Sequence, residues 1–326
     1  MPIEIVSPGL STTVQDLGRP GYYHLGIPEA GAMDRYSARA ANLLVGNDEG
    51  AALLEATFTG PVITFTDRRV VAVAGAELPP KVDGVAQPTW TSFVIEPGQT
   101  LSFDFLRSGS RAYIAISGGI DVPLVMGSRA TTPLSAIGGF KGRALQAGDR
   151  LDLLADGDRS VAPRTLADDL RRQDLAPVVE LRMLPGLYWH RITEAAGVNF
   201  FDDVWKVATE ADRVAARLKG GRPVDFVERE QPFGAGSDPS NVVDCGYPYG
   251  SVQMPGGIQP IILHRDAVSG GGYFMLGTVI SADMDLLAQL QPNQKMRFVK
   301  VDMDTAIAAR LARSRQTREL QAALAA

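Results

Sequence analysis

Residues 61–73, Pro-Val-Ile-Thr-Phe-Thr-Asp-Arg-Arg-Val-Val-Ala-Val, give the clearest sign of the fold. Two short runs rich in β-branched residues, 61–65 and 69–73, flank a polar turn, which is the pattern of paired β-strands. Farther along, residues 101–105 alternate apolar and polar side chains, as a half-buried strand does. Residues 112–116 are apolar almost throughout, which predicts a strand buried on both faces. We therefore expect a mainly β protein.

A few short helices interrupt this pattern. We expect them over about residues 34–45, around 284–290 and from 303 onward. The last of these carries arginines at one set of positions and aliphatic residues at the opposing set. The arginines are Arg310, Arg313, Arg315 and Arg318, and the aliphatic residues are Ile307, Leu311 and Leu320. Such a helix is typical of a solvated surface, although its basic face could also contact a partner.

The length of 326 residues is enough for two domains, each with a core of its own. Residues 156–177 are rich in Asp and Arg and poor in large apolar residues, whereas a strand pattern resumes at 178–182. We therefore predict a β-rich unit over 1–155, a linker or exposed excursion over 156–177, and a second β-rich unit with a terminal helix over 178–326.

Composition and charge exclude several classes of protein. A net charge of −5 gives no electrostatic footprint for nucleic acid, and no apolar run is long enough to span a membrane. The first residues resemble no secretory signal, so we expect a cytoplasmic protein. The three histidines, His24, His190 and His264, lie far apart without metal-ligand spacing, so we predict no metal site. No phosphate-binding glycine motif is present, so ATP, if it is used, is expected on another subunit.

Polar residues and residues with special backbone properties concentrate in two segments. The first is the opening 50 residues, which contain Asp16, Arg19, His24, Met33 and Asp34 among several glycines and prolines. Glycine and proline shape the backbone, while Asp, Arg and His can accept, donate and titrate. This combination is typical of a ligand-binding loop on a rigid scaffold. Asp16 and Arg19 could equally brace the loop as an ion pair, and His24 could equally be structural.

The second concentration covers residues 244–273, where the candidate binding residues are Gln253, Pro255, Gln259 and Tyr273. Glutamine offers both a donor and an acceptor to an amide, and glycines let the backbone approach a ligand closely. A pair of tight β-turns would produce the same glycine density. The single cysteine, Cys245, lies in this segment and is either a nucleophile or a small buried apolar residue.

The two segments, with further motifs between them, resemble the allophanate hydrolase subunit 2 family, which includes KipA-type proteins, the matching 5-oxoprolinase component and the matching half of the urea carboxylase carboxyltransferase domain. The resemblance rests on motifs in the expected order along almost the whole chain. They are Thr12-Thr13-Val14-Gln15-Asp16-Leu17-Gly18-Arg19-Pro20-Gly21, Gly31-Ala32-Met33-Asp34, residues 41–47, Gly118-Gly119-Ile120-Asp121, Gly127-Ser128-Arg129, Gly138-Gly139-Phe140, residues 250–255 and Gln259-Pro260-Ile261.

Three departures from the family pattern lie in the second half of the chain. Residues 212–217 read Asp-Arg-Val-Ala-Ala-Arg where the family has Asp-Arg-Met-Gly-Tyr-Arg. Ser269-Gly270 replaces a pair of threonines, and Leu187-Tyr188-Trp189 replaces a polar, proline-containing segment. These departures bear on which substrate the chain would bind and leave the expected fold unchanged.

The resemblance implies a fold of two cyclophilin-like β-barrel units with a few short helices. It also implies a subunit 1 (KipI-like) partner and, in 5-oxoprolinase, a further ATP-binding subunit. On this basis we expect a subunit of an enzyme that opens 5-oxoproline to glutamate with ATP. Arg19 would bind a substrate carboxylate or developing oxyanion, oriented by Asp16, and His24 would act as acid–base group.

Two other functions remain open from the sequence. One is carboxyl transfer to urea or a related amide, with carboxybiotin delivered on a separate carrier protein. The other is a non-catalytic role in which the chain regulates its KipI-like partner by binding to it. In each enzymatic case Met33, Asp34, Gln253, Pro255, Gln259 and Tyr273 are expected to bind the small amide substrate.

Overall fold

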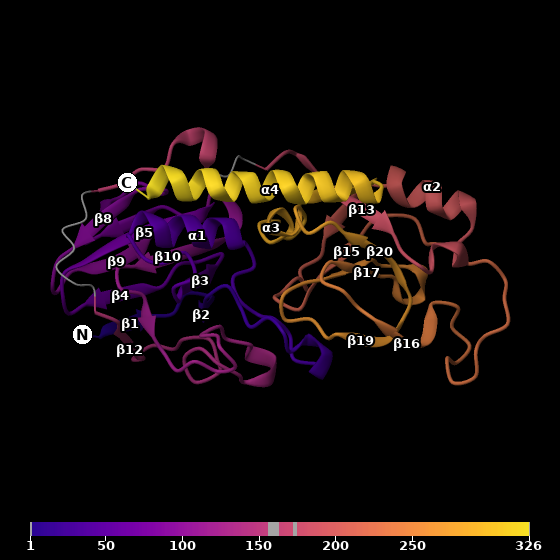
Figure 1. Ribbon diagram of the computed structural model, residues 1–326, viewed down its shortest axis with the longest axis horizontal. Helices are drawn as coiled ribbons and strands as arrows, with labels where there is room; N and C mark the ends of the chain where they lie inside the picture. The colour runs from indigo at the N-terminus through magenta and orange to yellow at the C-terminus, as the bar shows by residue number, and fades with distance from the viewer. Residues whose placement is uncertain (1, 156–162, 172–174, 326) are drawn as a thin grey trace. The chain divides into compact units, whose positions relative to one another are not determined.

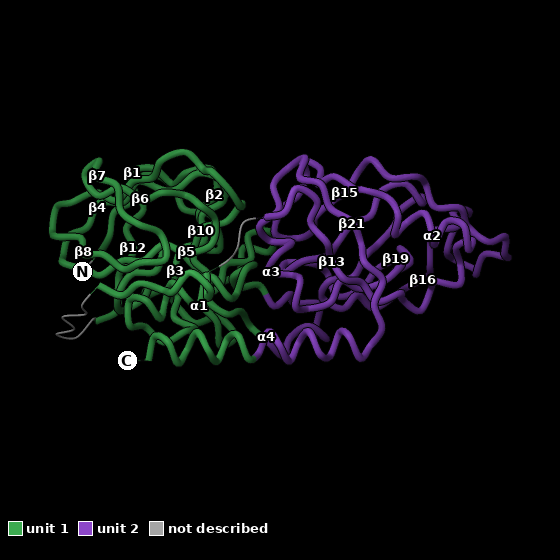
Figure 2. The backbone as a smooth tube through the Cα atoms, turned by 90° about the horizontal axis from the view of Figure 1, so that it is seen from above, with its two compact units in different colours: residues 1–19, 30–174, 315–326 green, residues 20–29, 175–314 purple. Residues whose placement is uncertain are grey.

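The computed structural model describes residues 2–155, 163–171 and 175–325. The chain divides into two compact units, shown in Figures 1 and 2. Unit 1 contains residues 1–19, 30–174 and 315–326, and unit 2 contains residues 20–29 and 175–314. Each unit is therefore built from more than one stretch of chain. Of the predicted excursion over 156–177, residues 156–162 and 172–174 lie outside the described residues.

Unit 1 contains two β-sheets. The seven-stranded sheet has the order β11-β12-β1-β4-β9-β6-β7, and the five-stranded sheet has the order β2-β3-β10-β5-β8. The strands are β1 (Ile3–Ser7), β2 (Ser11–Gln15), β3 (Leu53–Thr57), β4 (Val62–Phe65), β5 (Arg69–Glu77), β6 (Pro80–Val82), β7 (Val85–Ala86), β8 (Ser92–Ile95), β9 (Thr100–Phe103), β10 (Ser108–Ile116), β11 (Ile120–Asp121) and β12 (Arg150–Leu153). Apolar side chains from both sheets, such as Ile63 and Ile114, share one core.

The five-stranded sheet is buried on both faces. Along β10, Ala112, Ile114 and Ile116 join the core between the sheets, whereas Tyr113 and Ala115 join a second core on the opposite face. Helix α1 (Arg35–Leu44) covers that opposite face by packing on β5 and β10 (Figure 1). This arrangement confirms the prediction that residues 112–116 are buried on both sides. It also explains why they contain few polar residues.

Unit 2 is built around a closed seven-stranded barrel in the order β13-β20-β17-β18-β15-β14-β21. Its strands are β13 (Val178–Pro185), β14 (Trp205–Val207), β15 (Ala215–Lys219), β17 (Ser251–Gln253), β18 (Ile261–Leu263), β20 (Met275–Val279) and β21 (Lys295–Lys300). A separate two-stranded antiparallel sheet pairs β16 (Asn241–Gly246) with β19 (Gly270–Tyr273). The barrel core is aromatic-rich, with Phe200 stacked on Phe298 at 4.8 Å between ring centroids. The expectation of a mainly β fold is therefore confirmed.

The remaining elements are short except for the last helix. They are α2 (Glu194–Asp202), α3 (Met284–Leu287), and the 3-10 turns η1 (Tyr23–Leu25), η2 (Pro133–Ser135), η3 (Asp168–Leu170), η4 (Trp189–Arg191) and η5 (Pro255–Gly257). Helix α4 (Met303–Leu324) begins in unit 2 and ends in unit 1. Among the described helices, none has the length and hydropathy that crossing a bilayer requires.

Candidate functional site

Asp16 and Arg19 lie in unit 1, where both hold the segment 128–132. The Asp16 carboxylate accepts hydrogen bonds from the Ser128 hydroxyl (2.7 Å) and the Arg129 backbone N–H (2.6 Å). Arg19 is fully buried and donates to the Thr132 hydroxyl (2.7 Å) and to the carbonyl oxygen of Ala130. Both side chains thus brace the segment 128–132.

The loop around Arg19 is tightly packed. At Gly138, which has φ of +69°, a Cβ atom would lie 2.2 Å from the Ala130 carbonyl oxygen and 2.6 Å from Arg19 Nη2. Only glycine adopts this backbone conformation without strain and also leaves room for the guanidinium. Gly138 thus makes space for Arg19, and Gly139 makes space for the Thr131 side chain.

Met33 and Asp34 form the entry to α1. The Asp34 side chain caps the helix by accepting from Ser37 N (3.1 Å) and from the Ser37 hydroxyl (2.6 Å). The Met33 N–H donates to Glu55 Oε2 (2.9 Å), and the Tyr113 hydroxyl links Glu55 (2.8 Å) to the Asp34 N–H (2.7 Å). Glu55 and Tyr113 were not among the residues predicted from the sequence, although a lone carboxylate within the apolar run 51–56 was an available signal.

Burial and the adjacent carboxylates set the protonation state of the Tyr113 hydroxyl in this network. Burial first, and then the charges of Glu55 and Asp34, raise the pKa of Tyr113 well above its usual value. The hydroxyl therefore stays protonated at neutral pH and donates to Glu55. Neither Met33 nor Asp34 is exposed by more than 2%, so the structure places both predicted binding residues inside the scaffold of unit 1.

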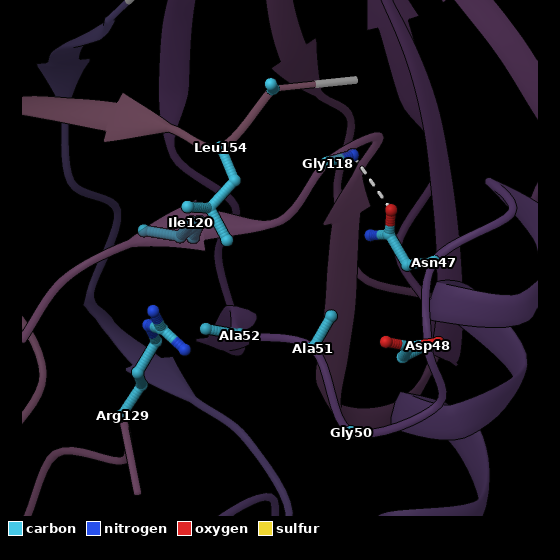
Figure 3. A pocket seen from close by; sticks show the side chains of 10 residues that line it. Asn47, Asp48, Gly50, Ala51, Ala52, Gly118, Ile120, Arg129 and Leu154 are labelled. Atoms are coloured by element: carbon cyan, nitrogen blue, oxygen red, sulfur yellow. Dashed lines mark hydrogen bonds between the residues drawn. The ribbon is translucent and has the colours of Figure 1, made fainter. Parts of the chain in front are cut away.

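A pocket of about 360 Å³ opens in unit 1 beside this scaffold (Figure 3). It is lined by Asn47, Asp48, Gly50, Ala51, Ala52, Gly118, Ile120, Arg129, Leu154 and Ala155. The Asn47 side-chain amide is hydrogen-bonded to the backbone, since it donates to Ile116 O (2.9 Å) and accepts from Gly118 N (2.8 Å). None of the predicted site residues lines this pocket.

The other predicted residues lie in unit 2. His24 is exposed on η1, and the neighbouring Tyr23 hydroxyl donates to the carbonyl oxygen of Tyr247 (2.7 Å). Glu29, at the end of the same segment, pairs with Arg265 (3.2 Å), whose guanidinium stacks on the Tyr249 ring at 3.9 Å. These contacts attach residues 20–29 to unit 2. Burial, and then the charge of Glu29, raise the pKa of Tyr23.

Tyr247 brings Gln253 and Tyr273 together. Its hydroxyl donates to the Tyr273 carbonyl oxygen (2.7 Å), accepts from the Tyr273 N–H (2.8 Å) and also interacts with the Gln253 side chain. Gln253 is almost buried, whereas the Tyr273 side chain is exposed. Pro255 begins η5 and Gln259, which is half-buried, follows it. Pro255 and Gln259 thus flank a turn next to the strand that carries Gln253.

A further polar group lies beside this one and was not predicted as a whole. The Tyr188 hydroxyl and the Cys245 thiol interact by a hydrogen bond, and Arg191 stacks on the Tyr188 ring with Cζ at 4.4 Å from the centroid. Burial raises the pKa of the Cys245 thiol, with the Asp244 carboxylate acting in the same direction. The thiol is therefore protonated at neutral pH, which disfavours its role as a nucleophile.

Within the described residues, no group of three or more His, Cys, Asp and Glu is arranged to hold a metal ion. The chemistry available in unit 2 is instead that of hydrogen-bond donors and acceptors: an amide, three tyrosine hydroxyls, a thiol and guanidinium groups. Such groups suit the recognition of a small molecule that carries carbonyl or carboxylate oxygens.

Comparisons with known proteins identify relatives over nearly the whole chain. A family described as carboxyltransferase domain, subdomain A and B, matches residues 25–300. The chain is 34% identical over 321 residues to the C component of 5-oxoprolinase from Escherichia coli (strain K12), covering 98% of this chain and 97% of that protein. It is also 33% identical over 317 residues to urea amidolyase of Saccharomyces cerevisiae, of which it covers only 17%.

The structural comparison agrees. The crystal structure of the K. lactis urea amidolyase matches with a TM-score of 0.91 and 30% sequence identity, over 98% of this chain and 20% of that chain. The chain therefore spans a small part of the urea amidolyases but nearly all of the 5-oxoprolinase component.

Proposed function

This chain belongs to the carboxyltransferase-domain family, subdomains A and B, and from that membership we propose that it is a subunit of an enzyme that hydrolyses a small lactam, 5-oxoproline, with ATP. The observation that carries the proposal is the coverage of 97% of the E. coli 5-oxoprolinase component, so that the two proteins match as whole chains.

In this reaction water adds across the ring amide, the C–N bond breaks, and glutamate is released. A subunit that binds the lactam needs to recognise an amide N–H, an amide oxygen and a carboxylate. The Gln253 side chain, held beside the Tyr247 hydroxyl, is suited to the amide edge, because glutamine both donates and accepts. ATP is proposed to bind on another subunit, alongside a KipI-like subunit 1, in a cytoplasmic complex.

The proposed catalytic residues separate into two kinds. Asp16 and Arg19 support catalysis indirectly, because their side chains bond to segment 128–132 of the same unit. His24 is exposed and so is available to a substrate or a partner subunit. We therefore keep His24 as the proposed acid–base group.

A second candidate function is carboxyl transfer to urea or a related amide, because the family is named for carboxyl transfer and urea amidolyase is among the relatives. In that case carboxybiotin would arrive on a separate carrier protein. The two functions make opposite predictions about biotin, since lactam hydrolysis does not require it.

The test is ATP turnover by the chain together with its subunit 1 partner and the ATP-binding subunit. We expect 5-oxoproline to stimulate phosphate release and glutamate formation only when this chain is present, and His24→Ala to lower that turnover. Stimulation by urea that needs a biotinylated carrier would establish the second function instead. No stimulation by either substrate would favour a regulatory role for the chain.

A further inference from the structure

Arg191, the last residue of η4, holds a buried nitrogen without a hydrogen-bond partner. Its Nη1 atom is inaccessible to solvent, and no atom of the described chain accepts from it. Buried N–H groups are almost always satisfied, and an exception calls for an explanation such as an absent ligand. The guanidinium is fixed in place because it stacks on the Tyr188 ring. An oriented, unsatisfied guanidinium is what a bound oxyanion requires.

A second arginine, Arg229, lies close enough to Arg191 to act on it electrostatically. Arg229 donates to the Asn241 carbonyl oxygen at 3.4 Å. Burial first, and then the positive charge of Arg229, lower the pKa of Arg191, so the two cations repel each other. Like charges held together in a folded protein cost free energy unless an anion lies between or beside them.

A carboxylate also acts on the Tyr188 and Cys245 side chains. Asp244 acts electrostatically on Tyr188 and Cys245, and its Oδ1 atom accepts the N–H of Cys245 (2.9 Å). The guanidinium of Arg191 nevertheless keeps a buried donor without an acceptor among the described residues, so the group can still bind an anion.

Neutral donors complete the group. Burial raises the pKa of both the Tyr188 hydroxyl and the Cys245 thiol, so both carry a proton at neutral pH. They can therefore share hydrogen bonds with a ligand without adding negative charge. Cys245 lies in the same two-stranded sheet, β16–β19, that Tyr247 links to Gln253. The cationic pair is thus connected to the group proposed above to bind an amide.

We propose that Arg191 and Arg229 form a binding subsite for the carboxylate of a small anionic substrate, with Tyr188 and Cys245 at its edge. The identification of that substrate as 5-oxoproline rests on the proposed function; the subsite itself does not. Arg191 binds the carboxylate through its planar guanidinium, which matches two carboxylate oxygens. Residues 187–189, which depart from the family pattern, come directly before His190 and Arg191. The proposed substrate contact therefore adjoins a segment in which this chain differs from the family.

The test measures binding of two ligands to the full chain by titration calorimetry: 5-oxoproline, and 2-pyrrolidinone, which is the same lactam without the carboxylate. The variants are Arg191→Met, Arg229→Met and Arg191→Lys. The control is Arg297→Met, which removes an exposed arginine of unit 2 that pairs with Glu180 on the barrel. Thermal unfolding of every variant verifies that it is folded.

We expect 5-oxoproline to bind more tightly than 2-pyrrolidinone, and Arg191→Met to weaken 5-oxoproline binding by about tenfold or more, the value of a charged hydrogen-bonded pair. Binding of 2-pyrrolidinone should be unchanged by that variant. Arg191→Lys should recover part of the loss because it restores the charge but not the planar fork. Arg297→Met should bind both ligands as the unaltered chain does.

If the free chain binds neither ligand, the same comparison is made on the assembled complex through KM. An unaltered preference for 5-oxoproline in folded Arg191→Met and Arg229→Met, or no carboxylate preference in either preparation, would overturn the subsite. Arginine-dependent binding of 5-oxoproline without any turnover by the complex would leave the subsite standing and overturn the proposed lactam hydrolysis. The two proposals can therefore fail separately.

Discussion

Glu55 on strand β3 is only 1% exposed to solvent. The fold accommodates its buried carboxylate through a few individual hydrogen bonds. Burying a charge without partners is costly, but Glu55 receives the Met33 N–H and the Tyr113 hydroxyl. The same hydroxyl accepts from the N–H of Asp34, the residue that caps α1. One tyrosine oxygen thus connects a sheet to the start of a helix, and residues 33–34 stabilise the fold of unit 1.

The ion pair between Arg143 and Asp149 makes the stability of unit 1 depend on pH. Arg143 donates to both carboxylate oxygens of Asp149 (2.7 and 2.8 Å), and this hydrogen bonding holds the pKa of Asp149 below its usual value. A lowered folded pKa contributes stability above the unfolded value of about 3.9, and the contribution is lost as the pH falls through the folded pKa.

We therefore expect Asp149→Asn to be less stable than the unaltered chain near neutral pH, with the difference shrinking as the pH falls below about 4. Urea unfolding at a series of pH values measures this difference. Asp152→Asn, at an exposed position on β12, is the control and should show a small difference throughout. A deficit for Asp149→Asn that stays constant down to acid pH would contradict the assignment.

Among the elements, α4 is the one whose two ends have different surroundings. Ile307 and Leu311 are 44% and 53% exposed, whereas Leu320 is fully buried in the core that α1 covers. The sequence predicted a solvated helix, and this holds for much of its first part. Leu320 packs instead into unit 1, and Arg313 pairs with Asp285 within unit 2.

This asymmetry predicts that two leucines of the same helix contribute differently to the free energy of unfolding. Leu320→Ala should lower the free energy of unfolding by about 2–5 kcal/mol, because it leaves a cavity in a packed core. Leu311→Ala on the same helix should change it by less than about 0.5 kcal/mol, because the side chain is exposed. Urea unfolding followed by tryptophan fluorescence measures both, since Trp90 belongs to the same core as Leu320. Equal effects of the two substitutions would show that α4 does not contribute to this core.

Elements with local signals were predicted well. The first helix was expected over about 34–45 and is observed over Arg35–Leu44, because Asp34 and the glycine after Val45 mark its ends. The strands at 61–65 and 69–73 were also found, although β5 runs on to Glu77. Its extension consists of small residues, Ala74 to Ala76, which carry little strand preference and depend on pairing with β10.

The site was harder to predict because its contacts are distant in sequence. Arg191 and Cys245 lie far apart along the chain, and no local pattern indicates that η4 and β16 place them near one another. Asp16 and Arg19 were singled out as specialised, but a motif does not reveal that their partners are at 128–132. In both cases the positions of the residues depend on hydrogen bonds between distant segments, which the periodicity of the sequence does not reveal.

At the scale of the whole molecule, residues 20–29 belong to unit 2 although the chain on either side belongs to unit 1. The contacts of Tyr23 and Glu29 hold this segment to the rest of unit 2. We expect Glu29→Ala to increase chymotrypsin cleavage at Tyr22 and Tyr23 several-fold, because local opening of the segment becomes easier. Gel electrophoresis with mass spectrometry of the fragments follows the cleavage.

The control for this experiment is Glu77→Ala in unit 1, which removes an exposed pair with Arg107 and should leave cleavage at residues 22–23 unchanged. Cleavage that is equally slow in Glu29→Ala would mean that the pair with Arg265 does not secure the segment.

The interleaving of the two units also has a consequence for synthesis on the ribosome. Unit 1 needs Leu320 to fill its second core, yet that residue is translated only after all of residues 175–314. Until then the core that contains Leu320 lacks part of its packing, and such exposed apolar surface favours aggregation or chaperone binding. Most of unit 1 is therefore synthesised first, but its folding is completed last, so translation and folding do not proceed in the same order.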